Sequence, residues 1–262
     1  VKEGPKNIVN TNADVAKEVL DYLKSVPKTE RGFTDEKVLA LTLLARTVSN
    51  VKDAILLLDA KRVVEARTIS RCVLENLYWI VGLAEEGEVF VRKMRDDEMS
   101  HRLAQGQNIF AADVALEEDV GERLRTFLRG VNKRFEKAKS LSPKLVAQIR
   151  SDFEKTYIFY GQLSSDAAHP SVTALNRYVI PETHPQGGGI DVEPVVSEHE
   201  LAETCEYLCM ASIGVCVAAN QIIGGTPGGA ALSGIAERHT DLSNRTKAAT
   251  IVLPVPAEQQ YQ

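Results

Sequence analysis

Two arginines and a glutamate recur at every fourth position in the most strongly periodic stretch of the chain, residues 64–83. Arg67, Arg71 and Glu75 therefore stack along one stripe of the predicted helix, at the edge of its apolar face. Charged groups there need partners, because an unpaired buried charge is costly. We favour an ion-pair network that locks neighbouring helices, since such networks are common. The alternative is one wall of an anion-binding or catalytic site.

A second group of polar residues leads into a His-Pro-Ser sequence. Its members before the histidine are Tyr160, Ser164, Ser165 and Asp166. Because the residue before a proline avoids helical backbone, we expect His169 at a corner between two helices, and at the N-cap of the second helix if Pro170 begins it. The helix dipole at that position keeps an imidazole neutral, fit to act as a base or a ligand. The alternative is a turn whose polar groups bond exposed backbone amides.

A third group lies in the charged sequence of residues 95–101. Glu98 and His101 are one helical turn apart, the spacing found in the metal-binding helices of carboxylate-bridged di-iron bundles. Those bundles need two such pairs and two further carboxylates, whereas this sequence offers one pair, so we predict neither a metal nor another cofactor. A solvated, charged helix face is the favoured interpretation. The alternative is a metal-dependent hydrolase that uses Glu75, Glu98, His101 and His169.

Helices must position all three groups. Hydrophobic periodicity near 3.6 residues predicts helices at residues 12–26, 34–59, 64–83, 89–112, 116–138, 143–163 and 197–223. The expected N-caps of the second, sixth and seventh of these are Thr34, Ser142 and Ser197, and Glu200 completes a capping box with Ser197. One or two further helical turns are expected at residues 172–178. Beyond residue 229 we expect a weak helix at best.

Strand signals are nearly absent, and no repeat of fixed period occurs. The exception is residues 180–196, where three consecutive glycines between short β-prone runs predict a two-stranded ribbon or a mobile loop. We therefore predict an all-α fold, a multi-helix bundle with a small β-ribbon or flap inserted before its last long helix. The expected organisation is an N-terminal helix and connection over residues 1–33, one bundle domain over residues 34–241 and a loosely held tail over residues 242–262.

Composition narrows the class of protein. Hydrophobic residues make up 44% and charged residues 26% of the 262, as in a soluble globular protein that can bury a full core. The net charge of -5 at pH 7 argues against nucleic-acid binding through bulk electrostatics but leaves room for a local basic groove. The four cysteines are scattered, so we expect reduced thiols in a cytoplasmic protein. We expect no secretory signal, no apolar run long enough to span a bilayer and no membrane partner.

Three short motifs resemble an uncharacterised bacterial family of all-helical proteins. They are Arg-Cys-Val-Leu-Glu at residues 71–75, Tyr-x-x-x-Ser at residues 160–164 and His-Pro-Ser at residues 169–171. The likeness covers roughly residues 34–223. The family in turn looks distantly like HEPN domains, helical bundles found in toxins, phage-defence proteins and nucleotide-binding partners. Active HEPN ribonucleases carry Arg-polar-x(3–5)-His, a spacing that Arg95 and His101 match.

This resemblance implies a cytoplasmic bacterial helical protein that binds a nucleotide or RNA in stress or phage defence, as a homodimer. The residues assigned to its chemistry are His169, Glu75 and Arg71. Those assigned to ligand binding are Arg67, Tyr160, Ser164 and Ser165. Arg95 and His101 are less favoured as site residues. In HEPN bundles the motif comes after the later helices, whereas these two residues lie in the fourth predicted helix. The alternatives are the metal-dependent hydrolase and a non-enzymatic module that dimerises through residues 197–223, with a purely structural ion-pair stripe.

Overall fold

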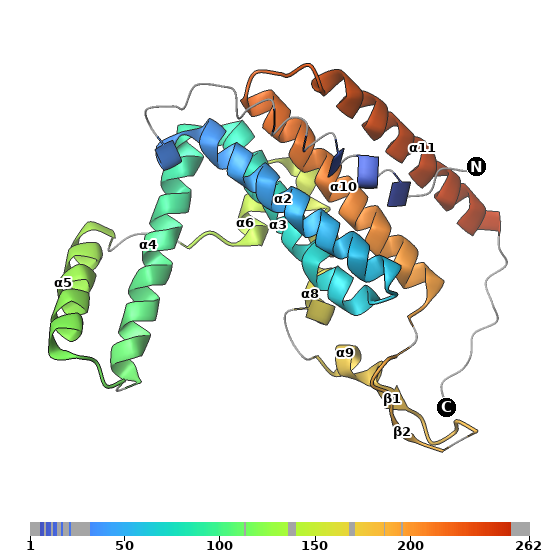
Figure 1. Cartoon of the computed structure of the whole chain (residues 1–262), viewed down its shortest axis with the longest axis horizontal. Helices are drawn as coiled ribbons and strands as arrows, with labels where there is room; N and C mark the ends of the chain where they lie inside the picture. The colour runs from blue at the N-terminus through green and yellow to red at the C-terminus, as the bar shows by residue number, and fades with distance from the viewer. Residues whose placement is uncertain are drawn as a thin grey trace.

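The structure is a computed structural model. It describes residues 32–252 except 113, 136–139, 168–170, 186 and 195, together with several residues between 6 and 21. The fold is mostly helical, as predicted, and a small antiparallel ribbon precedes the last two long helices (Figure 1). Its strands are β1 (Val179–Ile180) and β2 (Gly189–Ile190), with Val179 opposite Ile190. The predicted ribbon at residues 180–196 is therefore confirmed.

Three long helices, packed side by side, form the core of the bundle. They are α2 (Glu36–Asp59), α3 (Val63–Glu86) and α10 (Glu198–Ile222). Helix α3, which the periodicity of residues 64–83 predicts, is the central helix and packs against both α2 and α10. Its largest fully buried side chains are Leu74, Leu77, Tyr78, Ile80 and Leu83. A Cβ on Gly214 of α10 would lie 2.6 Å from Leu77 Cδ1, so this glycine lets α10 approach α3 closely.

Capping residues explain where two of the core helices begin. Ser197 and Glu200 form the predicted capping box of α10, in which the Ser197 hydroxyl accepts from the Glu200 amide at 3.1 Å. The predicted cap of α2 is wrong by one residue. Asp35, rather than Thr34, caps α2, and its carboxylate accepts from the Lys37 amide at 2.8 Å. An aspartate carboxylate at this position also interacts favourably with the helix dipole.

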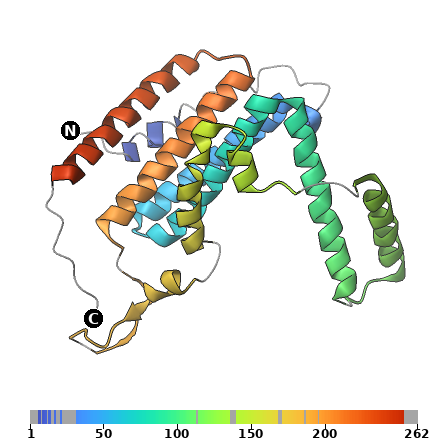
Figure 2. The same cartoon turned by 180° about the vertical axis from the view of Figure 1, so that it is seen from behind.

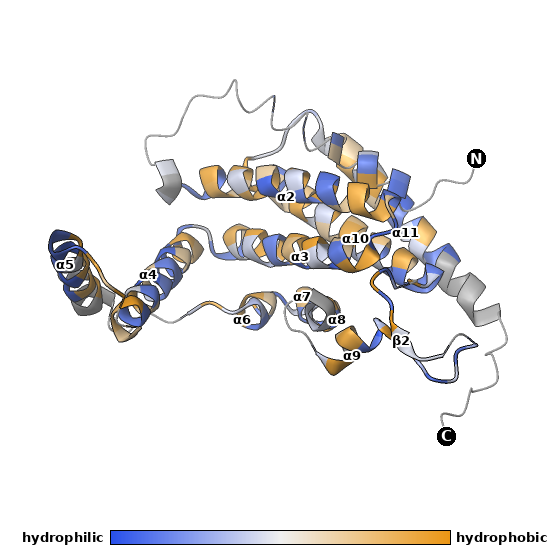
Figure 3. Cartoon of the chain, turned by 60° about the horizontal axis from the view of Figure 1, so that its bottom comes forward, coloured by the Kyte–Doolittle hydropathy of each residue, from blue (hydrophilic) through white to orange (hydrophobic). Residues whose placement is uncertain are grey.

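The predicted helix at residues 143–163 is wrong, because three short helices occupy this region. They are α6 (Pro143–Ala147), α7 (Ser151–Glu154) and α8 (Tyr157–Ala167). Ser142 caps the first as predicted. The backbone then becomes extended at Arg150, with φ -129, and the Thr156 hydroxyl donates to the Phe153 carbonyl at 2.6 Å where α7 ends. Helix α8 packs on α3, on the side opposite α2 (Figures 2 and 3).

A short helix, α9 (Val172–Asn176), follows α8 and confirms the helical turns expected at residues 172–178. Its N-cap is Ser171, whose hydroxyl accepts from the Ala174 amide at 3.0 Å. We expected His169 at the N-cap only if Pro170 began this helix, and because α9 begins at Val172 that condition is not met. The helix-dipole argument for a neutral His169 imidazole therefore does not apply. His169 itself lies outside the described residues.

Helices α4 (Glu88–Ala111) and α5 (Glu118–Phe135) form a hairpin that leaves the bundle (Figure 1). The two helices pack where a Cβ on Gly106 would lie 2.6 Å from Leu128 Cδ2. The Asp97 carboxylate on α4 accepts from the Leu141 amide at 2.6 Å, so it holds the returning chain beside α4. In the described part of the chain, the hairpin therefore contacts the bundle mainly through the start of α4 and this return.

The two ends of the chain depart from prediction. The described residues between 6 and 21 are helical, and Val9 and Ala13 are buried in the core, so this helix begins before residue 12. Past residue 229, where a weak helix at best is expected, α11 (Gly229–Val252) is a regular helix of 24 residues. It packs on α10 and buries Leu232 and Ile235.

Helix α10 also corrects the expectation that no apolar run is long enough to span a bilayer. By length and composition it is able to cross a membrane, with a mean hydropathy of 1.4. Most of it is nevertheless buried against α2, α3 and α11 of its own chain. A core helix has this composition for the same reason as a membrane helix, because apolar neighbours surround it.

Candidate functional site

Four of the predicted site residues meet between α3 and α8 and define what we call the Arg71 cluster: Arg71, Glu75, Tyr160 and Ser164. Arg71 Nε donates to Ser164 Oγ at 3.0 Å, and Nη2 donates to the Tyr160 hydroxyl. The guanidinium carbon lies 4.6 Å from the centroid of the Tyr160 ring. Nη1 reaches Glu75 Oε2 at 3.5 Å, which is a loose contact. Two neutral side chains are therefore the main groups that orient this cation.

Helical spacing places the members of the Arg71 cluster. Arg71 and Glu75 are four residues apart on α3, and Tyr160 and Ser164 are four apart on α8, so each pair lies on one helix face. The Ser164 hydroxyl donates to the Tyr160 carbonyl at 2.7 Å, which leaves its lone pairs to accept from Arg71. The Tyr160 ring stacks on Tyr157 with centroids 5.5 Å apart.

The Arg71 cluster is partly open to solvent. The side chain of Arg71 is 24% exposed and that of Glu75 is 34% exposed, whereas Tyr160 is buried. Burial raises the pKa of Tyr160, and the Glu75 carboxylate raises it further, against the opposing effect of Arg71. The phenol is therefore protonated at neutral pH and is a fixed polar neighbour of the guanidinium.

Arg67, one turn before Arg71 on α3, has a different environment. Its Nη1 donates to Glu203 Oε2 on α10 at 2.9 Å and to Thr204 Oγ1 at 3.3 Å, and its side chain is only 6% exposed. The other oxygen of Glu203 lies 2.9 Å from the Tyr207 hydroxyl. This is a largely buried ion pair between core helices, with the Glu203 side chain 22% exposed, as the structural interpretation of the stripe expects.

Ser165, Arg95 and His101 do not join the Arg71 cluster, and His169 lies outside the described residues. Ser165 is exposed, and its hydroxyl donates to the Gly161 carbonyl at 3.1 Å. Arg95 and His101 are exposed on α4, where His101 Nε2 lies 3.5 Å from Asp97 Oδ1. Across the part of the chain that the structure describes, no three histidine, cysteine or carboxylate side chains gather into a metal-binding group.

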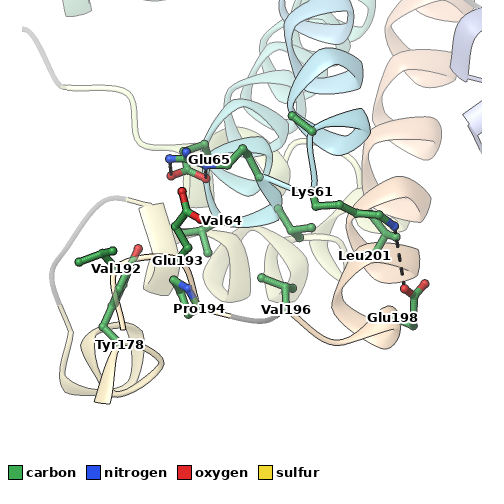
Figure 4. Close-up of a pocket in the computed structure, with 13 residues that line it drawn as sticks. Lys61, Val64, Glu65, Tyr178, Val192, Glu193, Pro194, Val196, Glu198 and Leu201 are labelled. Carbon is green, nitrogen blue, oxygen red and sulfur yellow. Dashed lines mark hydrogen bonds and ion pairs between the residues drawn. The ribbon is translucent and has the colours of Figure 1, made fainter. Parts of the chain in front are cut away.

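A cavity at the turn between α2 and α3 was not predicted from the residue pattern. A pocket of about 450 Å³ opens there, beside the chain that links the ribbon to α10 (Figure 4). Two ion pairs flank it: Arg62 with Glu65 at 2.8 Å, and Lys61 with Glu198 at 3.9 Å. The sequence signals this site only by the break between two predicted helices at residues 61–62. In the structure, Lys61 at this break adopts a positive φ of 60. The volume suits a small molecule, but the charged groups are paired with one another.

Fold and site together define an all-helical bundle protein with a polar cluster between its central helix and α8. A model for a family of unknown function, DUF5677, matches residues 37–187, and the chain therefore belongs to that family. The matched region contains the whole Arg71 cluster and the α4–α5 hairpin, and it ends before β2 and α10. No curated protein and no solved structure matches the chain.

Proposed function

We propose that the protein binds a phosphate-bearing ligand, a nucleotide or an RNA end, at the Arg71 cluster. The contrast between two arginines of α3 carries this proposal. Arg67 is buried and neutralised by a carboxylate at 2.9 Å, whereas Arg71 is partly exposed and held mainly by a serine and a tyrosine. A guanidinium that neutral groups hold in place keeps positive charge available to an incoming anion.

The chemistry of the Arg71 cluster suits this class of ligand. A guanidinium presents a planar fork that binds two phosphate oxygens at once. A phosphate on the solvent side of Arg71 would replace the loose contact between Nη1 and Glu75 Oε2, which spans 3.5 Å. The Glu75 carboxylate would then be free to accept from a ribose hydroxyl. His169 as a base or donor, and a HEPN-like role in stress or phage defence, remain predictions from the sequence.

The test is the melting temperature of the full chain with AMP, ATP, GTP and a short RNA, 5′-phosphorylated or not. At a ligand concentration about 100 times the dissociation constant, binding adds about 2.7 kcal/mol of stability, which raises the melting temperature by about 5–10 °C. We expect such a rise with at least one phosphorylated probe, and none with the unphosphorylated RNA. Arg71→Lys should abolish it, because lysine keeps the charge but loses the fork.

A matched control is Arg102→Lys, which changes an exposed arginine of α4 that pairs with Glu98. This variant should respond to the probes as the wild type does. If no phosphorylated probe stabilises the wild type at millimolar concentration, the proposal is wrong.

The second candidate is the non-enzymatic module, in which the Arg71 cluster only joins α3 to α8. It is favoured by the fact that each member of the Arg71 cluster bonds to another member. It predicts that Arg71→Lys lowers the melting temperature of the protein alone and that no probe changes that temperature.

A further inference from the structure

Trp79, the only tryptophan of the chain, continues the polar stripe of the central helix. It lies four residues after Glu75, which in turn lies four residues after Arg71, so the three side chains follow one another along α3. Each step of four residues turns this row by about 40° around the helix. Trp79 is therefore about 80° from Arg71, and all three side chains belong to one side of α3.

This side of α3 is the one that the other helices in the described part of the chain leave open. Leu77, two residues before Trp79, lies on nearly the opposite side and packs on Gly214 of α10. Helices α2 and α8 pack on α3 on either side of that contact. On the open side, Thr68 is exposed, and Glu75 and Trp79 are partly exposed. The row from the Arg71 cluster to Trp79 is therefore accessible to a ligand.

The indole of Trp79 has one packed side and one accessible side. The packed side contacts the hydrophobic core, which holds the ring in place. Among the described residues, the aromatic pairs near it join Tyr78 to Tyr160 and Tyr157 to Tyr160, and no ring stacks on Trp79. A fixed indole with no aromatic partner of its own offers a surface on which a planar base can stack.

The order of the groups along this row matches the order of the groups in a nucleotide. Glu75 Oε2 lies 3.5 Å from Arg71 Nη1, and residues four apart on a helix have Cβ atoms about 5–6 Å apart. A phosphate at Arg71 therefore places the attached ribose at Glu75 and the base at Trp79. A carboxylate accepts from ribose hydroxyls but repels a further phosphate, so the middle of the row suits a sugar.

We propose that the ligand of the Arg71 cluster is a nucleoside 5′-monophosphate, free or at the 5′ end of an RNA, whose base stacks on Trp79. This inference rests on the proposed phosphate site at Arg71 and extends that site by one helical turn beyond Glu75. Stacking on an aromatic side chain tolerates every base, because every base has a π-face. The site therefore separates ligands with a base from ligands without one, rather than one base from another.

The experiment titrates the full chain with AMP and with ribose 5-phosphate, which lacks the base. Isothermal titration calorimetry gives both dissociation constants. The tryptophan fluorescence of the protein comes from Trp79 alone, so its quenching reports on stacking at this residue. We expect AMP to quench the fluorescence and to bind at least about fivefold more tightly than ribose 5-phosphate, which should leave the fluorescence unchanged.

Variants of Trp79 separate stacking from a structural role. Trp79→Ala should weaken the binding of AMP by about fivefold to 100-fold and leave the binding of ribose 5-phosphate within about twofold of the wild type. Trp79→Phe keeps a ring for the base and should retain most of the affinity for AMP. The control is Phe127→Ala, which removes a 39% exposed aromatic ring from α5 and should leave the binding of AMP unchanged.

The possible results distinguish this inference from the phosphate site on which it rests. Equal affinities of the wild type for AMP and ribose 5-phosphate, or unchanged fluorescence with AMP bound, would overturn the stacking inference and leave the phosphate site at Arg71 in place. Equal weakening of both ligands in Trp79→Ala would overturn it as well. If AMP, ribose 5-phosphate and 5′-phosphorylated RNA all fail to bind at millimolar concentration, both proposals are wrong. An RNA that binds more tightly than AMP, with the same quenching, identifies an RNA end as the ligand.

Discussion

The guanidinium of Arg67 on α3 and the carboxylate of Glu203 on α10 are 2.9 Å apart, and they join the two helices that share the largest interface of the bundle. Arg67→Ala would leave Glu203 at this interface without its cation. We expect a loss of about 3 kcal/mol in the free energy of unfolding, as for other half-removed buried ion pairs. Urea denaturation of Arg67→Ala measures it. The double variant Arg67→Met with Glu203→Leu should lose less free energy of unfolding than Arg67→Ala. If it loses as much, or if the losses at the two positions simply add, the two side chains do not form a buried pair.

Two helical glycines should respond in opposite ways to the same substitution. A Cβ on Gly82 of α3 would lie 2.4 Å from the Phe90 ring, and that ring is fully buried. Gly82→Ala should therefore destabilise the protein by about 2 kcal/mol or more. A Cβ on Gly161 of α8 would meet nothing within 4 Å, so Gly161→Ala should stabilise by about 0.5–1 kcal/mol. Thermal unfolding of the two variants measures both changes. If both variants are stabilised or both are destabilised, the described packing around these two glycines is wrong.

Local sequence patterns predicted the elements whose signals lie within a few residues. The capping box of Ser197 and Glu200 and the periodicity of residues 64–83 depend only on neighbours in the chain, and both predictions are confirmed. The single helix predicted at residues 143–163 is wrong, because the pattern does not show that the backbone turns extended at Arg150. The long α11 was missed because its stability comes from contacts with α10 rather than from its own periodicity.

The candidate site shows the same limit. The four-residue spacing predicts that Arg71 and Glu75 share one face of their helix, and that Tyr160 and Ser164 share one face of theirs. That these two faces meet is a property of the packing of α3 on α8. Arg67 has the same spacing as Arg71, so nothing in the sequence separated the buried ion pair from the partly exposed cation.

The cysteines should differ in reactivity according to their burial. Cys205, Cys209 and Cys216 are buried on α10, and Cys72 on α3 is partly exposed. Burial raises the pKa of Cys209 to about 12 and also raises that of Cys205, so their thiolates are scarce at pH 8. We expect iodoacetamide to modify Cys72 first in the folded protein, and the other three only after unfolding. Peptide mass spectrometry over a time course measures this order, and early modification of Cys209 would contradict the buried position of α10.

Alkaline pH should destabilise the bundle through its buried tyrosines. Burial raises the pKa of Tyr78 on α3 from 10.0 to about 12, and its hydroxyl lies 3.2 Å from that of Thr156. A raised pKa in the folded state means that this contribution to stability is complete below pH 10 and is lost as the pH rises toward 12. The loss approaches about 1.4 kcal/mol per pH unit for one such group.

Urea denaturation of the wild type and Tyr78→Phe at pH 8, 9, 10 and 11 tests this expectation. Removing the phenol should make the free energy of unfolding fall less steeply above pH 10, although burial also raises the pKa of Tyr160 and Tyr207 and so leaves part of the slope. Tyr160→Phe is the matched comparison, because that ring belongs to the Arg71 cluster and its hydroxyl accepts from Arg71. Identical slopes for Tyr78→Phe and the wild type would mean that the Tyr78 hydroxyl is not buried between α3 and the start of α8.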